Sequence, residues 1–179
     1  MIYSSTCTSP VGELTMASDG EHLLGLWIEG QKYAYGTLSE TPAPRDGLAV
    51  FDQTKDWLRR YFTGAKPTPA ELPLAPIGGA FRQGVWKILT EIPYGQVTTY
   101  GTIAAQMAAA AGKARMSAQA VGGAVGHNPI SIIVPCHRVV GVNGSLTGYA
   151  GGIHIKQRLL EHEGVDMSGL FVPKKGTAL

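Results

Sequence analysis

Apolar and polar positions group into short stretches over the first third of the chain. Two apolar stretches, 12–17 and 23–29, are separated by the turn signal Asp19-Gly20, a pattern typical of an antiparallel hairpin or meander. Residues 49–62 follow with apolar side chains near helical spacing, which predicts an amphipathic helix. The first part of the chain is therefore expected to be an α/β domain with a small antiparallel sheet and a helix.

Residues 66–79 contain four prolines and form the predicted linker between an N-terminal domain, 1–75, and a C-terminal domain, 76–179. Beyond it the apolar spacing predicts helices over 81–91, 103–111 (capped by Thr98 or Thr99), 118–126 (capped by Ser117) and 156–163. The two short helices in the middle favour a helix-turn-helix, although any αα-hairpin gives the same pattern. The run 130–134 predicts a buried strand before Pro135. The second domain is thus expected to be mostly α-helical.

The composition is typical of a globular protein, with 44% of the 179 residues hydrophobic and 16% charged. No apolar run approaches the roughly 18 residues that span a membrane. The N-terminus lacks a basic stretch followed by an apolar one, so no secretory signal is expected. We therefore expect a cytoplasmic protein, or a nuclear one in a eukaryote, with Cys7 and Cys136 as free thiols.

The net charge of +2 is unevenly divided along the chain. Residues 1–75 hold six Lys/Arg and nine Asp/Glu, a net charge of −3, whereas residues 76–179 hold nine Lys/Arg and four Asp/Glu, a net charge of +5. This asymmetry suits a C-terminal half that faces a polyanion, although a mildly basic surface without a partner gives the same charges.

The sharpest chemical signal is the run 134–139, Val-Pro-Cys-His-Arg-Val. A cysteine after an apolar strand and a proline is held rigidly, but burial raises a thiol pKa, so reactivity requires a nearby base or positive charge. His137 can reach Cys136 only where the chain turns, or through a water. A carboxylate would then orient the imidazole, and Glu163 is the best candidate. A buried, inert cysteine beside a satisfied histidine is the alternative.

Small residues mark the segment 118–126. Glycine inside a helix costs about 1 kcal/mol relative to alanine, and this segment contains several. A face formed by Ala120, Gly123 and Ala124 can approach either a packed helix or a nucleic-acid backbone closely, and helix packing is the more frequent cause. Tyr100, at the start of the preceding helix, can be a core residue with its hydroxyl free for hydrogen bonding.

Together these motifs resemble the C-terminal domain of the O6-alkylguanine-DNA alkyltransferases over residues 81–164. The matching stretches are Ile92-Pro93-Tyr94-Gly95-Gln96-Val97-Thr98-Thr99-Tyr100, Ala120-Val121-Gly122-Gly123-Ala124, Asn128-Pro129, Val134-Pro135-Cys136-His137-Arg138-Val139-Val140, Gly148-Tyr149-Ala150-Gly151-Gly152 and His162-Glu163-Gly164. They cover nearly half of the chain and are highly specific as a set. The N-terminal part resembles the smaller α/β domain of that family only in pattern.

The resemblance implies direct repair of O6-alkylguanine, and of O4-alkylthymine, by irreversible, stoichiometric transfer of the alkyl group to Cys136. His137 is implied to act through a water as the base, and Glu163 to orient His137. Asn128 braces the turn ahead of the cysteine. Tyr100 hydrogen-bonds the flipped guanine and helps to protonate it.

The resemblance also implies how the substrate is held. Backbone groups of Cys136, Val139 and Ala150 read the guanine edge, Tyr149 lines the pocket, and Lys156 lies close by. The second helix of the pair enters the minor groove of double-stranded DNA, and the residues expected to contact DNA are Gln119, Ala120, Gly123, Arg115 and Arg138. A monomer without a cofactor and without membrane contact is expected.

The sequence departs from the family pattern at two places. Gln119 stands where the family has an arginine that inserts into the space left by the flipped base. The connection between Tyr100 and Gln119 is also longer than usual, through 108–117. The zinc site of some relatives is not expected, because the N-terminal part offers Cys7 and His22 but no second cysteine.

Three other functions share part of the pattern. A non-enzymatic lesion-binding protein would lack the cysteine. A helix-turn-helix regulator would need base-reading side chains, whereas 118–126 offers only Gln119. A cysteine hydrolase would use the same Cys-His pair but would turn over, whereas an alkylated thioether is not released.

Overall fold

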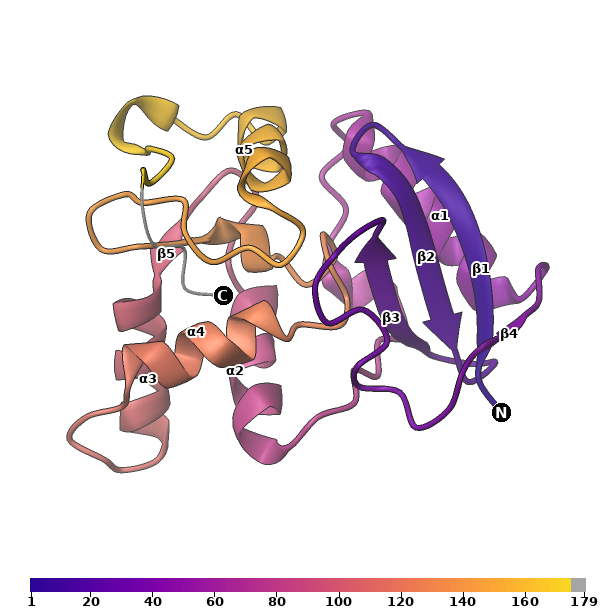
Figure 1. Cartoon of the computed structure of the whole chain (residues 1–179), viewed down its shortest axis with the longest axis horizontal. Coiled ribbons are helices and arrows are strands. Elements are labelled where there is room, and N and C mark those ends of the chain that lie inside the picture. The colour runs from indigo at the N-terminus through magenta and orange to yellow at the C-terminus, as the bar shows by residue number, and fades with distance from the viewer. Residues whose placement is uncertain (175–179) are drawn as a thin grey trace. The chain divides into compact units, whose positions relative to one another are not determined.

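The computed structural model describes residues 1–174 (Figure 1). They form two compact units: residues 1–78 together with 129–133, and residues 79–128 together with those from 134 onward. This differs from the linear division predicted at residue 75, because the short segment 129–133 groups with the first unit.

The first unit contains a four-stranded sheet in the order β3-β2-β1-β4. Its strands are β1 (Tyr3–Ser9), β2 (Gly12–Ser18), β3 (Leu23–Ile28) and β4 (Ala43–Pro44). β2 is antiparallel to both β1 and β3, and β4 runs parallel to β1. The predicted pairing of the second and third strands is therefore confirmed. β1 was not predicted, because its sequence YSSTCTS lacks the apolar alternation that marks a half-buried strand.

One helix covers the sheet (Figure 1). α1 (Ala49–Phe62) has the predicted bounds and contacts β1 and β2. Its buried face carries large side chains, among them Trp57, whose indole N–H donates to the Thr68 carbonyl at 2.8 Å. The proline-rich segment that follows contains one short 3-10 helix, η1 (Pro69–Glu71), closed by a capping box from Thr68 to Glu71. The predicted linker is therefore not wholly irregular.

The segment 129–133 joins the first unit at β3. Leu26 N–H donates to the Pro129 carbonyl at 2.8 Å, and Ser131 N–H donates to the Leu26 carbonyl at 2.9 Å. Only Ile130 forms a β-bridge, so the strand predicted over 130–134 is wrong. The chain turns at once: Ile132 has φ 70°, and Ile133 N–H donates to the Ser131 carbonyl. This is a γ-turn in its strained form, unusual for a β-branched residue.

The second unit is mostly helical, as predicted. It contains α2 (Ala80–Thr90), β5 (Thr98–Thr99), α3 (Tyr100–Ala110), α4 (Ala118–Gly126), η2 (Cys136–Arg138), β6 (Val139–Val140), α5 (Ile153–His162) and η3 (Met167–Gly169). Thr99 caps α3 and Ser117 caps α4, both through the side-chain oxygen. α2 packs against α3 and α4, and the Trp86 indole donates to the Ala124 carbonyl at 2.8 Å. Within residues 1–174 no helix has the length and apolar character needed to cross a membrane.

Candidate active site

A tight turn places Cys136. Pro135, at φ −82° and ψ 66°, is the centre of an inverse γ-turn in which the Cys136 N–H donates to the Val134 carbonyl at 2.8 Å. Since the proline ring fixes φ near this value, the sequence itself favours the turn. η2 begins directly at Cys136, whose side chain is buried. The cysteine therefore stands on a turn rather than at the end of a strand.

The side chain of Asn128 braces this turn. Its amide nitrogen donates to the Val134 carbonyl at 2.8 Å, and the side chain also hydrogen-bonds the Cys136 thiol. Asn128 and Val134 are the residues at which the chain leaves the second unit and returns to it. The Asn128 side chain therefore links the two residues that flank segment 129–133 and also contacts the thiol.

His137 and Glu163 form a buried hydrogen-bonded pair. The His137 Nε2 and Glu163 Oε1 atoms are 2.6 Å apart, and neither side chain has exposed surface. Glu163 is the C-cap residue of α5, so the fold joins two groups that are 26 positions apart. His137 Nδ1 is also buried and has no hydrogen-bond partner within residues 1–174. The carboxylate fixes one ring nitrogen, and the other is available for a further polar group.

Arg138 completes the surroundings of Glu163 and is buried. Its Nε donates to Glu163 Oε2 at 2.9 Å, its Nη2 to Glu163 Oε1 at 3.0 Å, and its Nη1 to the Ile92 carbonyl at 2.6 Å. The expectation that Arg138 contacts DNA is therefore wrong, because its charge is paired with a buried carboxylate. The Gly95 N–H, which had no role in the sequence analysis, donates to Glu163 Oε2 at 3.1 Å.

These contacts control protonation in the site. Burial raises the pKa of the Glu163 carboxyl, but the hydrogen bonds and charges of His137 and Arg138 outweigh it and hold that pKa well below its usual range. Burial lowers the pKa of His137, against the opposing effect of Glu163. Burial also raises the pKa of the Cys136 thiol, opposed by the hydrogen bond from Asn128. The resting site therefore holds a thiol, a neutral imidazole and a carboxylate.

The carbonyl of Thr147 joins two further predicted residues. It accepts a hydrogen bond from the Tyr100 hydroxyl and one from the Lys156 ammonium, each at 2.9 Å, and Lys156 also donates to the Val139 carbonyl. Burial lowers the pKa of Lys156 to about 8, with the charge of Cys136 opposing. Burial raises the pKa of Tyr100, and Cys136 adds to this rise. Tyr100, Lys156 and the thiol thus act on one another electrostatically.

The parallel pairing of β5 with β6 explains why Tyr100 lies near the cysteine. Thr98 pairs with Val139 and Thr99 with Val140. α3 begins immediately after β5, and β6 begins immediately after η2. The two-stranded sheet therefore holds the first residue of α3 beside the turn that carries Cys136.

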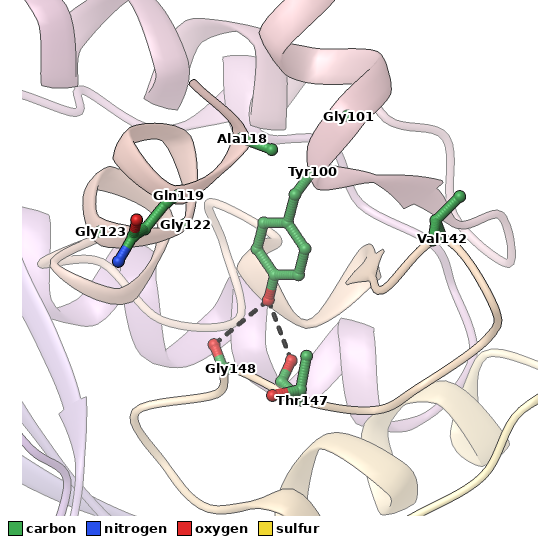
Figure 2. Close-up of a pocket in the computed structure, with 9 residues that line it drawn as sticks. All are labelled: Tyr100, Gly101, Ala118, Gln119, Gly122, Gly123, Val142, Thr147 and Gly148. Atoms are coloured by element: carbon green, nitrogen blue, oxygen red, sulfur yellow. Dashed lines mark hydrogen bonds between the residues drawn. The ribbon is translucent and has the colours of Figure 1, made fainter. Parts of the chain in front are cut away.

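A pocket of about 740 Å³ opens beside Tyr100 in the second unit. Its walls come from the starts of α3 and α4 and from the loop before α5, through Tyr100, Gly101, Ala118, Gln119, Gly122, Gly123, Val142, Thr147 and Gly148. Figure 2 shows the Tyr100 ring reaching from α3 toward the backbone of Thr147 and Gly148, with Gln119 on α4. The volume is that of a small-molecule site, about 300–1,000 Å³, and small residues form most of the walls.

The remaining predicted residues divide between the interior and the surface. Val139 and Tyr149 are buried, and the Tyr149 hydroxyl has no hydrogen-bond partner in the described part of the chain. Ala150 is partly exposed. Of the residues expected to contact DNA, Gln119, Ala120 and Arg115 are exposed and Gly123 is partly exposed.

Comparison with known families shows a match over almost the whole chain. The profile described as 6-O-methylguanine DNA methyltransferase, DNA binding domain, matches residues 80–165, and the profile of the ribonuclease-like domain of the same proteins matches residues 2–76. The chain belongs to the 6-O-methylguanine DNA methyltransferase family. Its relatives include the methylated-DNA–protein-cysteine methyltransferases of Haemophilus influenzae, at 40% identity (90% of this chain and 86% of that one), and of Mycobacterium bovis, at 45% (91% and 93%).

Solved structures of this methyltransferase family have the same fold. The crystal structure of Mycobacterium tuberculosis OGT in complex with DNA aligns with a TM-score of 0.78 at 43% identity, over 90% of this chain and 92% of that one. The O6-methylguanine-DNA methyltransferase of the archaeon Pyrococcus kodakaraensis aligns with a TM-score of 0.65 at 26% identity, over 92% and 100%. The fold predicted from the resemblance, an α/β part followed by a helical part, is confirmed.

We expect this methyltransferase to contain no zinc. Within residues 1–174 no three His, Cys, Asp or Glu side chains come together as a metal site requires. Elemental analysis of protein purified without a chelator should give well under one zinc per chain. A stoichiometric metal whose removal abolishes alkyl transfer would contradict this expectation.

Proposed function

We propose that this protein repairs O6-alkylguanine in double-stranded DNA by transferring the alkyl group irreversibly to the Cys136 sulfur. The observation that carries the proposal is the position of the thiol. Cys136 lies close enough to Tyr100 to act on its pKa, and Tyr100 lines the pocket. His137, the next residue in the chain, is hydrogen-bonded to Glu163. A nucleophile, a base and an orienting carboxylate are therefore combined near Tyr100, which lines a cavity of suitable size, although Cys136, His137 and Glu163 are not among the residues that line it.

In the proposed reaction a sulfur–carbon bond forms as the carbon–oxygen bond to the guanine breaks. The thiol proton passes to His137, through a water that uses the open Nδ1 atom. Glu163 stabilises the imidazolium that results, since its carboxyl pKa is held low enough to keep it charged. The electron pair of the broken bond stays on the guanine, which finally gains the proton that the thiol lost; the Tyr100 hydroxyl hydrogen-bonds the guanine and helps to protonate it.

The alkylated base must leave the duplex to reach the thiol. Chemistry on a base atom within a duplex requires extrusion, at a cost of a few kcal/mol. α4 offers an exposed first turn and a face of small residues with which to approach the DNA backbone. Because shape rather than sequence selects a flipped base, the same pocket is proposed to accept O4-alkylthymine.

A lesion-binding protein without transfer is the second candidate function. The intact Cys136, His137 and Glu163 favour transfer over binding alone. The two functions are separated by stoichiometry. In the proposed reaction the number of O6-methylguanines repaired rises with time to one per chain and then stops. A lesion-binding protein would leave every lesion intact, and a hydrolase would repair many lesions per chain.

Gln119 is proposed to fill the space left by the flipped base. It lies in the first turn of α4, is exposed, and lines the pocket. Glutamine can hydrogen-bond the unpaired cytosine but carries no charge. We expect Gln119→Ala to slow repair of duplex DNA while hardly changing the reaction with free O6-benzylguanine, which needs no flipping. Gln119→Arg should tighten DNA binding and steepen its salt dependence by up to about one phosphate contact.

Both variants are measured by transfer rates on duplex and on free base and by DNA affinity across salt concentrations. If Gln119→Ala repairs duplex DNA at the parent rate, Gln119 is not the residue that replaces the base. Arg115, exposed in the connection ahead of α4, is then the next candidate.

A further inference from the structure

The connection between α3 and α4 carries two cations without ion-pair partners. Lys113 and Arg115 are both exposed, and neither forms a salt bridge within the described residues 1–174. The start of the connection is fixed in place: Gly112 takes φ 64°, and the Lys113 N–H donates to the Ala108 carbonyl at 2.8 Å. This is the six-to-one bond of a helix C-terminus that glycine closes. The backbone that carries the cations is therefore ordered against α3.

These cations line a groove of about 380 Å³. On one side are the methyl groups of four alanines of α3, Ala104, Ala105, Ala108 and Ala109. On the other are residues 113–116 and the start of α4. No acidic side chain lines the groove, so nothing in it competes for the two positive charges.

The groove adjoins the pocket beside Tyr100. Gly101 and Ala118 line both cavities, so they form the wall that the two share. The opposite side of the pocket is formed by the loop 141–148, which contains no charged residue. Lys156 lies behind that loop but is buried, so the shared wall leads from the pocket to two exposed cations, Lys113 and Arg115.

We infer that this groove binds the sugar–phosphate backbone of the damaged strand next to the flipped nucleotide, with Lys113 and Arg115 on its phosphates. The inference rests on the proposed function and extends it to the path of the strand. A flipped nucleotide stays covalently attached to its neighbours, so its strand must cross the border of the pocket. Alanine methyl groups permit close approach of the backbone, and two unpaired cations complement its charge. The undamaged strand is not covalently attached to the flipped nucleotide and therefore need not cross this border.

The first test is the salt dependence of duplex binding. Log K falls as log salt rises, and each phosphate contact makes this slope steeper by about 0.9. The double variant Lys113→Ala/Arg115→Ala should therefore have a slope that is shallower by nearly two. Between 50 and 200 mM salt the parent should then lose about 12-fold more affinity than the double variant. Lys87→Ala is the matched control, because Lys87 is an exposed lysine of α2 that lines neither cavity.

The second test locates the contact on one strand. Duplexes carry neutral methylphosphonate linkages beside the lesion, either in the damaged strand or in the strand opposite. Neutral linkages in the damaged strand should weaken binding of the parent and of Lys87→Ala but should leave the double variant unchanged. An effect confined to the opposite strand would overturn the inference, as would a double variant whose salt slope equals that of the parent or of Lys87→Ala.

Reaction with free O6-benzylguanine separates this inference from the proposed function. The double variant should alkylate Cys136 with the free base at the parent rate, since neither cation belongs to the reacting site. If Cys136 of the parent is not alkylated by free base or duplex, the proposed function fails whatever the groove binds. If Cys136 is alkylated normally and the salt slope does not change, the groove inference alone fails.

Discussion

Replacing Glu163 by glutamine is expected to slow alkyl transfer to Cys136 by about 100- to 10,000-fold, the usual range for a general base. The carboxylate is charged and buried, and it holds His137 Nε2 at 2.6 Å. Without its charge the imidazole loses the group that stabilises it as it takes the thiol proton. His137→Ala should slow transfer over the same range, while DNA affinity stays nearly unchanged in both variants.

Glu163 also pairs with Arg138, so replacing it affects the stability of the protein as well as the transfer rate. Arg138 makes two hydrogen bonds to this carboxylate, and leaving a buried charge unpaired costs about 3–5 kcal/mol of stability. Glu163→Gln is therefore compared with the double variant Glu163→Gln/Arg138→Met, which removes the unpaired charge. If loss of activity came only from unfolding, the double variant would recover the transfer rate. We expect it to recover stability but to stay slow.

The measurement is the pH dependence of Cys136 alkylation by free O6-benzylguanine, which reports the apparent pKa of the thiol in the site. Glu161→Gln is the control on α5, since this exposed carboxylate accepts a hydrogen bond only from Gln157 among the contacts seen. Its profile should equal that of the parent. A thiol pKa that is the same in the parent, Glu163→Gln and His137→Ala would show that the proposed chain of groups does not exist.

Much of the fold could be predicted from local patterns. The helix over Ala49–Phe62 has its predicted bounds, because its apolar spacing is regular. Ser117 was predicted as a helix cap and is one, whereas the other cap was left open between Thr98 and Thr99, and the structure selects Thr99. β1 was not visible, since its residues owe their extended form to pairing with β2 along their whole length. Pairing between strands is a tertiary contact that single-strand composition does not encode.

The apolar run ahead of Cys136 was interpreted as a strand because a short apolar run gives no period that separates a strand from a buried turn. In the structure Ile130 alone forms a bridge, and Ile132 takes a left-handed conformation. Strain at such a residue is tolerated where the surroundings fix it. Pro135, which did predict a rigid position for the cysteine, is the residue that makes the following turn.

The sequence predicted most residues of the site but only some of their contacts. Cys136, His137 and Glu163 follow from a specific motif, and the structure places the last two in direct contact. Arg138 was assigned to DNA because a sequence displays charge but not its partner, here 25 positions away. No sequence pattern indicates that the Thr147 carbonyl accepts hydrogen bonds from both Tyr100 and Lys156. Every residue has a carbonyl, and only the fold determines which donors reach it.

Transfer to Cys136 is expected to be complete, covalent and limited to one event per chain. The thioether that forms has no route back to a thiol within this site, since water would have to displace the Cys136 thiolate, a poor leaving group, from an unactivated alkyl carbon. Cys7, the other cysteine, lies on β1 in the first unit, and burial raises the pKa of its thiol. It has no histidine beside it in the sequence. Cys136→Ala should therefore abolish transfer, whereas Cys7→Ala should retain it.

Intact mass after incubation with duplex DNA containing O6-methylguanine tests this account most directly. The parent and Cys7→Ala should each gain one methyl group per chain, peptide mapping should locate it on Cys136, and Cys136→Ala should gain none. Methyl label on Cys7, or repair of many lesions with no change in protein mass, would contradict the account.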